Sequence, residues 1–158
     1  AITKDLDALQ PFIYSALAIK KRFIEIDEFD EGIRNIFNFG HSFGHAIESA
    51  TNFGVPHGVA VTMGMDVACQ IAASRNLLPS NESTRMRTAL KKNYQTFAHV
   101  PIPLDASMNA LLKDKKNSST ELGLILPVGE QAKIEKVMIP PNEEFVDQFR
   151  HALGAIAQ

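Results

Sequence analysis

The sequence predicts a mainly α-helical fold with one small β-hairpin. Apolar residues recur at helical spacing in three long segments, and two short segments rich in Leu, Ile and Val flank Gly129. The long segments are 5–26, 59–77 and 80–99, and the short ones are 122–127 and 133–139. No repeat or long linker divides the chain, so we expect residues 1–158 to form a single helical domain.

Local signals indicate where the helices begin and end. Pro11 suits the first turn of the first helix, Pro79 ends the apolar helix, and Ser80 or Asn81 is expected to cap the next one. The basic residues of that next helix, Arg87 among them, are expected to point outward. Two further helices are expected, over residues 105–112 and 143–157.

The composition is that of an ordinary soluble protein. The chain is 45% hydrophobic and 22% charged, with a formal net charge of -2, so no strong basic balance indicates nucleic-acid binding. No apolar run approaches the roughly 18 residues that span a bilayer, and no signal peptide is evident. Cys69 is the single cysteine, which excludes an intrachain disulfide and fits a reducing compartment. We therefore expect a cytoplasmic protein, and the start at Ala1 suggests a processed product or a fragment.

A functional site is expected in residues 34–58, which hold three of the five histidines. Read as one helix, this stretch has polar residues at positions i, i+4, i+7 and i+11, all on one face. These residues are Arg34, Asn38, His41 and His45. A His-x-x-x-His pair alone is more often structural, but the arginine and asparagine beside it favour a site.

Two glycines and a third histidine strengthen this expectation. Gly40 and Gly44 lie one turn apart, and each costs a helix interior about 1 kcal/mol relative to alanine, so another backbone or a ligand should approach closely. His57 lies between Pro56 and Gly58, at a turn before the next helix. Imidazoles converging in this way suit a zinc-type ion.

An acidic cluster, residues 27–32, precedes this stretch. Its carboxylates either interact favourably with a helix N-terminus, at about 0.3–1 kcal/mol per charge, or supply an acid/base group near the histidines. Asp30 is the candidate for the second role, because it lies four residues before Arg34. Spacing alone makes Lys20 a solvated lysine.

These motifs resemble those of 3-dehydroquinate synthases. RNIFNFGHSFGHAIE followed by HGVAV is similar to the family's metal-site signature, Arg-x-x-x-Asn-x-Gly-His-[Ser/Thr]-x-Gly-His-Ala-x-Glu with His-Gly further along. IKKRFIEIDEFDEGIR is similar to its lysine-containing helix and acidic turn, and KDKKNSSTELGLILPVGE to its Asp-Lys-Lys segment and following strand. The wider sugar phosphate cyclase superfamily shares the central pattern.

The resemblance implies roles that spacing could not assign. His41 and His57 would ligate Zn²⁺ or Co²⁺, His45 would be an acid/base residue, and Asp30 would handle protons. The residues implied in substrate binding are Lys20, Arg34, Asn38, Lys115 and Lys116. A third metal ligand, a glutamate, and the NAD-binding domain would belong to an N-terminal half absent from this chain. The full-length enzyme would be a homodimer.

The implied activity is that of a lyase of the shikimate pathway for aromatic amino acids. The family converts the sugar acid phosphate DAHP to 3-dehydroquinate with phosphate elimination, and this chain alone is expected to be inactive. Val59 stands where the family commonly has a glutamate after His-Gly, and Asp30 stands where it usually has a glutamate, whose side chain is one methylene longer. These two differences leave the identity of the substrate undetermined. The alternatives are an inosose or valiolone synthase, a metal-dependent polyol dehydrogenase, or a helical interaction domain without catalysis.

Overall fold

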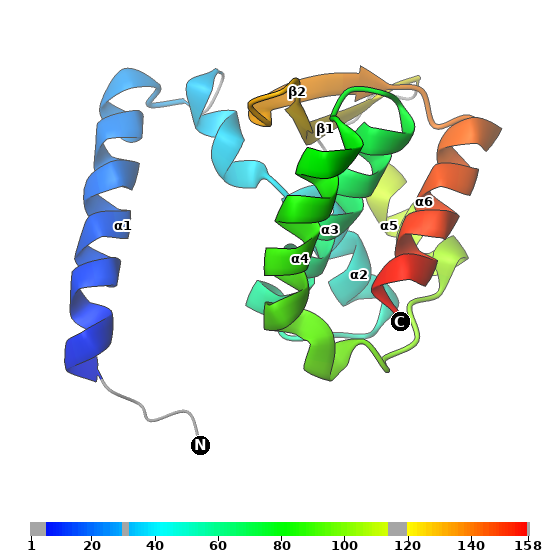
Figure 1. Cartoon of the computed structure of the whole chain (residues 1–158), viewed down its shortest axis with the longest axis horizontal. Coiled ribbons are helices and arrows are strands. Elements are labelled where there is room, and N and C mark those ends of the chain that lie inside the picture. Colours follow the sequence, from blue (N-terminus) through cyan, green and yellow to red (C-terminus); the bar gives the residue numbers. More distant parts are fainter. Residues whose placement is uncertain (1–5, 30–31, 114–119, 158) are drawn as a thin grey trace. The chain divides into compact units, whose positions relative to one another are not determined.

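The structure, a computed structural model, describes residues 6–29, 32–113 and 120–157. Within these ranges it contains six α-helices, two short 3₁₀ helices and one two-stranded sheet (Figure 1). The elements are α1 (Leu6–Ile26), η1 (Ile33–Asn38), α2 (His41–Ala50), α3 (His57–Ser74), α4 (Ser80–Tyr94), η2 (Gln95–Phe97), α5 (Leu104–Leu112), β1 (Leu122–Val128), β2 (Lys133–Ile139) and α6 (Glu143–Ile156). The predicted mainly helical fold with a small hairpin is confirmed.

Backbone contacts group the chain into two compact units, residues 1–37 and 38–158. In the first unit, Phe23 of α1 packs edge-on against Phe37, with ring centroids 5.0 Å apart. Pro11 lies inside α1, so the expectation that this helix starts there is wrong. A proline within a helix removes one backbone hydrogen bond, and α1 accommodates that loss. That residues 1–158 form one domain stays a prediction.

The second unit is built around α3, which packs against α2, α4, α6 and β1. A helix that is apolar on all sides is buried on all sides, and Ala60, Val67 and Ile71 are fully buried. It ends at Ser74, before the predicted end, and Asn76 follows in the left-handed region with φ 56°. Neither α3 nor another described helix has the length and hydropathy to cross a membrane.

The predicted hairpin pairs β1 with β2 in antiparallel register, from Leu122 opposite Ile139 to Val128 opposite Lys133. Gly129 begins the connecting turn with φ 73°, a conformation that glycine adopts without strain. Almost all of β1 is buried and the strand packs against α3, whereas the residues of β2 are mostly exposed or half-buried. Apolar side chains on both faces of β1 therefore anchor the hairpin to the helices.

Residues 34–45 do not form the single helix expected from the spacing of their polar residues. The 3₁₀ helix η1 ends at Asn38, and α2 begins at His41. Between them Gly40 has φ 78°, which lies outside the right-handed helical region and interrupts the helix. The four residues expected on one polar face are therefore divided between two helices, with Arg34 and Asn38 in η1 and His41 and His45 in α2.

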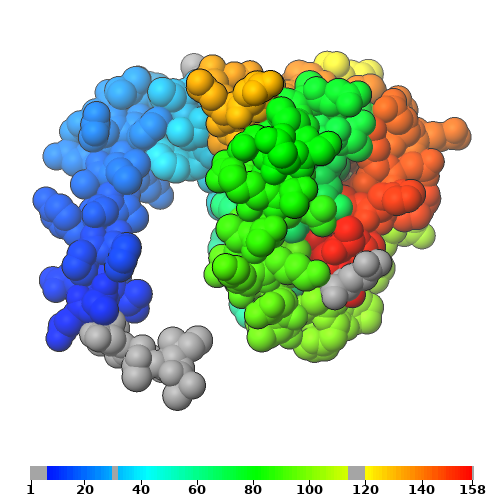
Figure 2. All heavy atoms as spheres, in the orientation of Figure 1, coloured from blue at the N-terminus to red at the C-terminus, as the bar shows by residue number. Residues whose placement is uncertain are grey.

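Two expectations for α4 are also wrong. The residue before its first turn is Pro79, and no side chain caps this end. Arg87 does not point outward, because its Nε lies 2.7 Å from Oδ1 of Asp66, which is only 1% exposed. Tyr94 Oη also donates to this carboxylate, at 2.7 Å. A buried carboxylate requires hydrogen-bonding partners, and α4 supplies two of them for Asp66. Figure 2 shows α4, in green, on the near face of the second unit, with the hairpin in orange beside it.

Candidate metal and substrate site

Three histidines meet where α2 and α3 begin. His41 is the first residue of α2, His45 follows one turn later, and His57 is the first residue of α3. The centroid of the His41 ring lies 5.8 Å from the ring centroids of both His45 and His57. The ring centroids of His45 and His57 are 5.7 Å apart. The convergence expected from the sequence is therefore present, and it joins two helices through a short connection.

Close contact of the two helix backbones holds these rings together. A Cβ atom added to Gly44 would lie 2.9 Å from Cα of Val61, and one added to Gly64 would lie 2.1 Å from the carbonyl oxygen of Gly40. Such distances leave no room for a side chain, so α2 and α3 approach each other through glycine. The expectation that a second backbone approaches Gly40 and Gly44 is confirmed.

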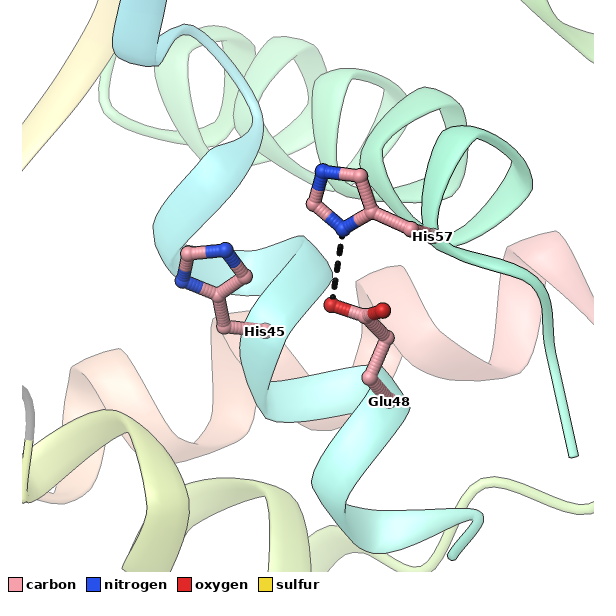
Figure 3. Close-up of side chains that lie close together, drawn as sticks. All are labelled: His45, Glu48 and His57. Carbon is pink, nitrogen blue, oxygen red and sulfur yellow. Dashed lines mark hydrogen bonds and ion pairs between the residues drawn. The ribbon is translucent and has the colours of Figure 1, made fainter. Parts of the chain in front are cut away.

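Glu48 joins the histidines, although it was not among the site residues expected from the sequence. Its Oε2 lies 3.0 Å from Nδ1 of His57, as the dashed line in Figure 3 marks. The Glu48 side chain is 11% exposed and that of His57 is 57% exposed. The available signal was its position three residues after His45, which places both on one side of α2.

The donor atoms present suit a divalent metal ion. His45, Glu48 and His57 each offer one ligand atom, and these atoms all lie within 4.8 Å of one another. Imidazole nitrogen and carboxylate oxygen are ligands that zinc and cobalt accept. His41 belongs to the ring cluster but not to this group, so its assignment as a ligand stays a prediction.

Arg34 lies in the first unit and contacts the acidic turn. Its Nη1 donates to the carbonyl oxygens of Asp27, at 3.0 Å, and Glu28, at 2.6 Å, and its backbone N–H donates to Oδ2 of Asp27, also at 3.0 Å. The carboxylate of Asp27 also accepts from the backbone N–H of Gly32. These contacts order the chain leading into η1. A substrate-binding role for Arg34 stays a prediction.

The remaining predicted residues are distributed along the chain. Lys20 is exposed on α1, in the first unit, and Asn38 is half-buried at the end of η1. Asp30, Lys115 and Lys116 lie outside the described residues. Their roles stay predictions.

The chain is similar to known sequences along most of its length. A family model described as 3-dehydroquinate synthase C-terminal matches residues 1–117. The 3-dehydroquinate synthase of Streptococcus pyogenes serotype M5 (strain Manfredo) is 35% identical over 127 residues, covering 78% of this chain and 35% of that protein. The Helicobacter pylori (strain ATCC 700392 / 26695) enzyme is 36% identical over 129 residues, covering 80% and 38%. The chain thus spans little more than a third of the length of these relatives.

Solved structures share the fold. A crystal structure of 2-deoxy-scyllo-inosose synthase complexed with carbaglucose-6-phosphate, NAD⁺ and Co²⁺ matches with a TM-score of 0.58 at 26% identity, covering 80% of this chain and 37% of that one. A second structure of 2-deoxy-scyllo-inosose synthase matches with a TM-score of 0.60 at 30% identity, covering 80% and 34%. A valiolone synthase, ValA from Streptomyces hygroscopicus subsp. jinggangensis 5008, matches with a TM-score of 0.61 at 22% identity, covering 85% and 36%.

Proposed function

The chain belongs to the 3-dehydroquinate synthase family, and from this premise we propose that it supplies the metal- and substrate-binding part of an enzyme that converts DAHP to 3-dehydroquinate with loss of phosphate. The observation that carries the proposal is the meeting of His41, His45 and His57 at the junction of α2 and α3. A nicotinamide-binding half in the same enzyme would hold NAD, since these 158 residues contain no glycine-rich phosphate loop.

Two of the three histidines hold the ion and one moves a proton in this proposal. His41 and His57 ligate Zn²⁺ or Co²⁺, and the inosose synthase of similar fold contains Co²⁺. Such an ion, when bound, acts as a Lewis acid on hydroxyl and carbonyl oxygens. His45 is exposed at the edge of the cluster, where its imidazole can accept a proton from a substrate hydroxyl and return it later.

Cationic and polar residues bind the acidic substrate. Arginine's planar fork matches carboxylate and phosphate oxygens, and lysine adds point charge. The proposed set comprises Lys20, Arg34, Asn38, Lys115 and Lys116, with Asp30 as a further proton-handling group.

Metal analysis and turnover of three histidine variants test these roles. In an enzyme that joins this chain to its nicotinamide-binding half, His41→Ala and His57→Ala should lose the metal, whereas His45→Ala should keep the metal and lose turnover. Loss of metal in His45→Ala as complete as in the other two would replace this division by a site in which all three histidines are ligands.

Inosose synthesis is the second candidate function. It is favoured by the structural similarity to 2-deoxy-scyllo-inosose synthase, which is 30% identical to this chain over the matched part. Phosphate release from DAHP, compared with release from a hexose 6-phosphate, distinguishes the two functions. Release from the hexose phosphate alone would assign the chain to the inosose synthases.

A further inference from the structure

Glu48 is a buried acid beside a proposed metal ligand. It lies on α2, two turns after His41, and its carboxylate faces the first residue of α3. The Glu48 side chain is 11% exposed, and its Oε2 lies 3.0 Å from Nδ1 of His57. Burying a carboxylate costs free energy unless it is hydrogen-bonded, so this contact has a role in the folded chain.

We propose that Glu48 is a positioning residue that sets which nitrogen of His57 faces the metal. Neutral imidazole carries one N–H and one lone-pair nitrogen, and an ionised carboxylate can only accept. When Glu48 accepts from Nδ1–H of His57, the proton is held at Nδ1 and the lone pair stays at Nε2. Metal-bound histidines commonly donate their other N–H to a carboxylate in this way, which fixes both tautomer and ring orientation. The inference rests on the proposed role of His57 as a ligand.

The side chains lie as this role requires. In Figure 3 the Nδ1 atom of His57 points at Glu48, and the second ring nitrogen points away from it. His57 is 57% exposed and His45 is also exposed, so the accessible part of the cluster lies away from the buried carboxylate. An ion bound through Nε2 can keep an open position for substrate on that accessible side.

The alternative is that Glu48 itself binds the ion, since its oxygen and the nitrogens of His45 and His57 lie within 4.8 Å of one another. An ion held by Glu48 would replace the hydrogen bond to Nδ1 of His57 and lie on the buried side of that ring. The exposure of the two side chains favours the positioning role. The two arrangements also predict different metal-bound nitrogens on His57, so experiment can separate them.

Metal titration of the 158-residue chain tests the proposal with matched variants. Glu48→Met removes the acceptor while keeping a buried side chain of similar length, and Glu48→Gln keeps an acceptor oxygen without the charge. Glu144→Gln on α6 is the control, because Glu144 is an exposed glutamate whose side chain accepts a hydrogen bond from Gln148 on the same helix. Co²⁺ binding followed by visible absorption should weaken 10- to 100-fold in Glu48→Met, less in Glu48→Gln, and not in Glu144→Gln.

Nitrogen NMR of the imidazole rings supplies a readout that does not depend on metal or turnover. In the metal-free chain, His57 should carry its proton on Nδ1, and Glu48→Met should give a mixture of tautomers. With Co²⁺ replaced by diamagnetic Zn²⁺, the metal-bound nitrogen should be Nε2. An unchanged tautomer and affinity in Glu48→Met would overturn the positioning role, and so would zinc bound at Nδ1.

Failure of the proposed function gives a different pattern. If His57→Ala binds Co²⁺ as tightly as the unaltered chain, His57 is not a ligand and the proposed function loses its metal site. If His57→Ala loses Co²⁺ while Glu48→Met retains full affinity, the ligand role stands and only the positioning role fails. Unfolding curves of each variant, compared with that of the unaltered chain, separate both outcomes from loss of the fold.

Discussion

Replacing Gly64 by alanine perturbs the contact between α2 and α3 that brings the histidines together. The added Cβ would lie 2.1 Å from the carbonyl oxygen of Gly40 and 2.6 Å from the backbone nitrogen of Gly44. Both neighbours are backbone atoms, so no side-chain rotation can relieve the overlap. The two helices would have to move apart, and the packing between them would be lost.

The size of the effect follows from two opposing contributions. Overpacking a core costs about 1–3 kcal/mol and occasionally more, and a clash with rigid backbone on the facing helix belongs at the upper end. Alanine in a helix interior gains about 1 kcal/mol over glycine. The free energy of unfolding of Gly64→Ala should therefore fall by about 2 kcal/mol or more.

Gly154→Ala is the matched control. Gly154 also lies inside a helix, α6, but an added Cβ there meets nothing within 4 Å. Only the gain in helix propensity remains, so stability should rise by up to about 1 kcal/mol. Urea unfolding of the 158-residue chain, followed by circular dichroism, measures both variants. If Gly64→Ala is as stable as Gly154→Ala, the two helices do not approach each other as described.

Three further perturbations test other parts of the second unit. Arg87→Met removes the ion-pair partner of Asp66 and should lower the free energy of unfolding by about 2 kcal/mol. This loss is smaller than that expected for a fully buried ion pair, because the Arg87 side chain is 33% exposed whereas that of Asp66 is 1% exposed. Unchanged urea unfolding would show that this ion pair adds no stability. Burial of the Cys69 thiol, together with the negative charge of Asp66, raises the pKa of Cys69 from 9.0 to about 12. As the pH rises, the thiol therefore loses its proton in the unfolded chain before it does so in the folded chain, and the free energy of unfolding should fall between pH 9 and about 12. The fall should be smaller in Cys69→Ala, and equal slopes for the two proteins would argue against the raised pKa. Asn142→Ala removes the side-chain oxygen that accepts a hydrogen bond, at 3.0 Å, from the backbone N–H of Phe145 at the start of α6. The free energy of unfolding should fall by about 1 kcal/mol. An unaltered thermal midpoint would show that this helix cap does not stabilise the fold.

Elements with strong local signals could be predicted from the sequence. The hairpin formed where two apolar segments flank Gly129, and α6 begins after Asn142, whose side chain accepts a hydrogen bond from within the first turn. These features depend on residues close together in the chain, and their energetics are largely local. The ends of α3 and the start of α1 were less well predicted, because several nearby residues could each have ended or begun the helix.

The start of α2 shows a different limit. Spacing alone allowed one helix through residues 34–45, and the cost of Gly40 and Gly44 indicated that another backbone or a ligand approaches closely, without identifying it. The structure identifies the partner as the backbone around Val61 and Gly64 of α3, and it places Gly40 at φ 78°. A positive φ at one glycine breaks the helix, and nothing in a periodic pattern distinguishes that from a glycine inside it.

By itself, the sequence determined the helical class, the hairpin, the family and the residue types of the metal-site motif, because these follow from local periodicity and from residues close together in the chain. Only the tertiary structure decided which buried charges are paired. Asp66 and Arg87 are 21 residues apart and form an ion pair at 2.7 Å, and Glu48 meets His57 across a turn. Burying a charged residue costs free energy unless it is hydrogen-bonded or paired, and Arg87 and His57 both come from a different helix than the carboxylate they contact. That condition depends on how the helices pack, so it could not be read from the charges along the chain.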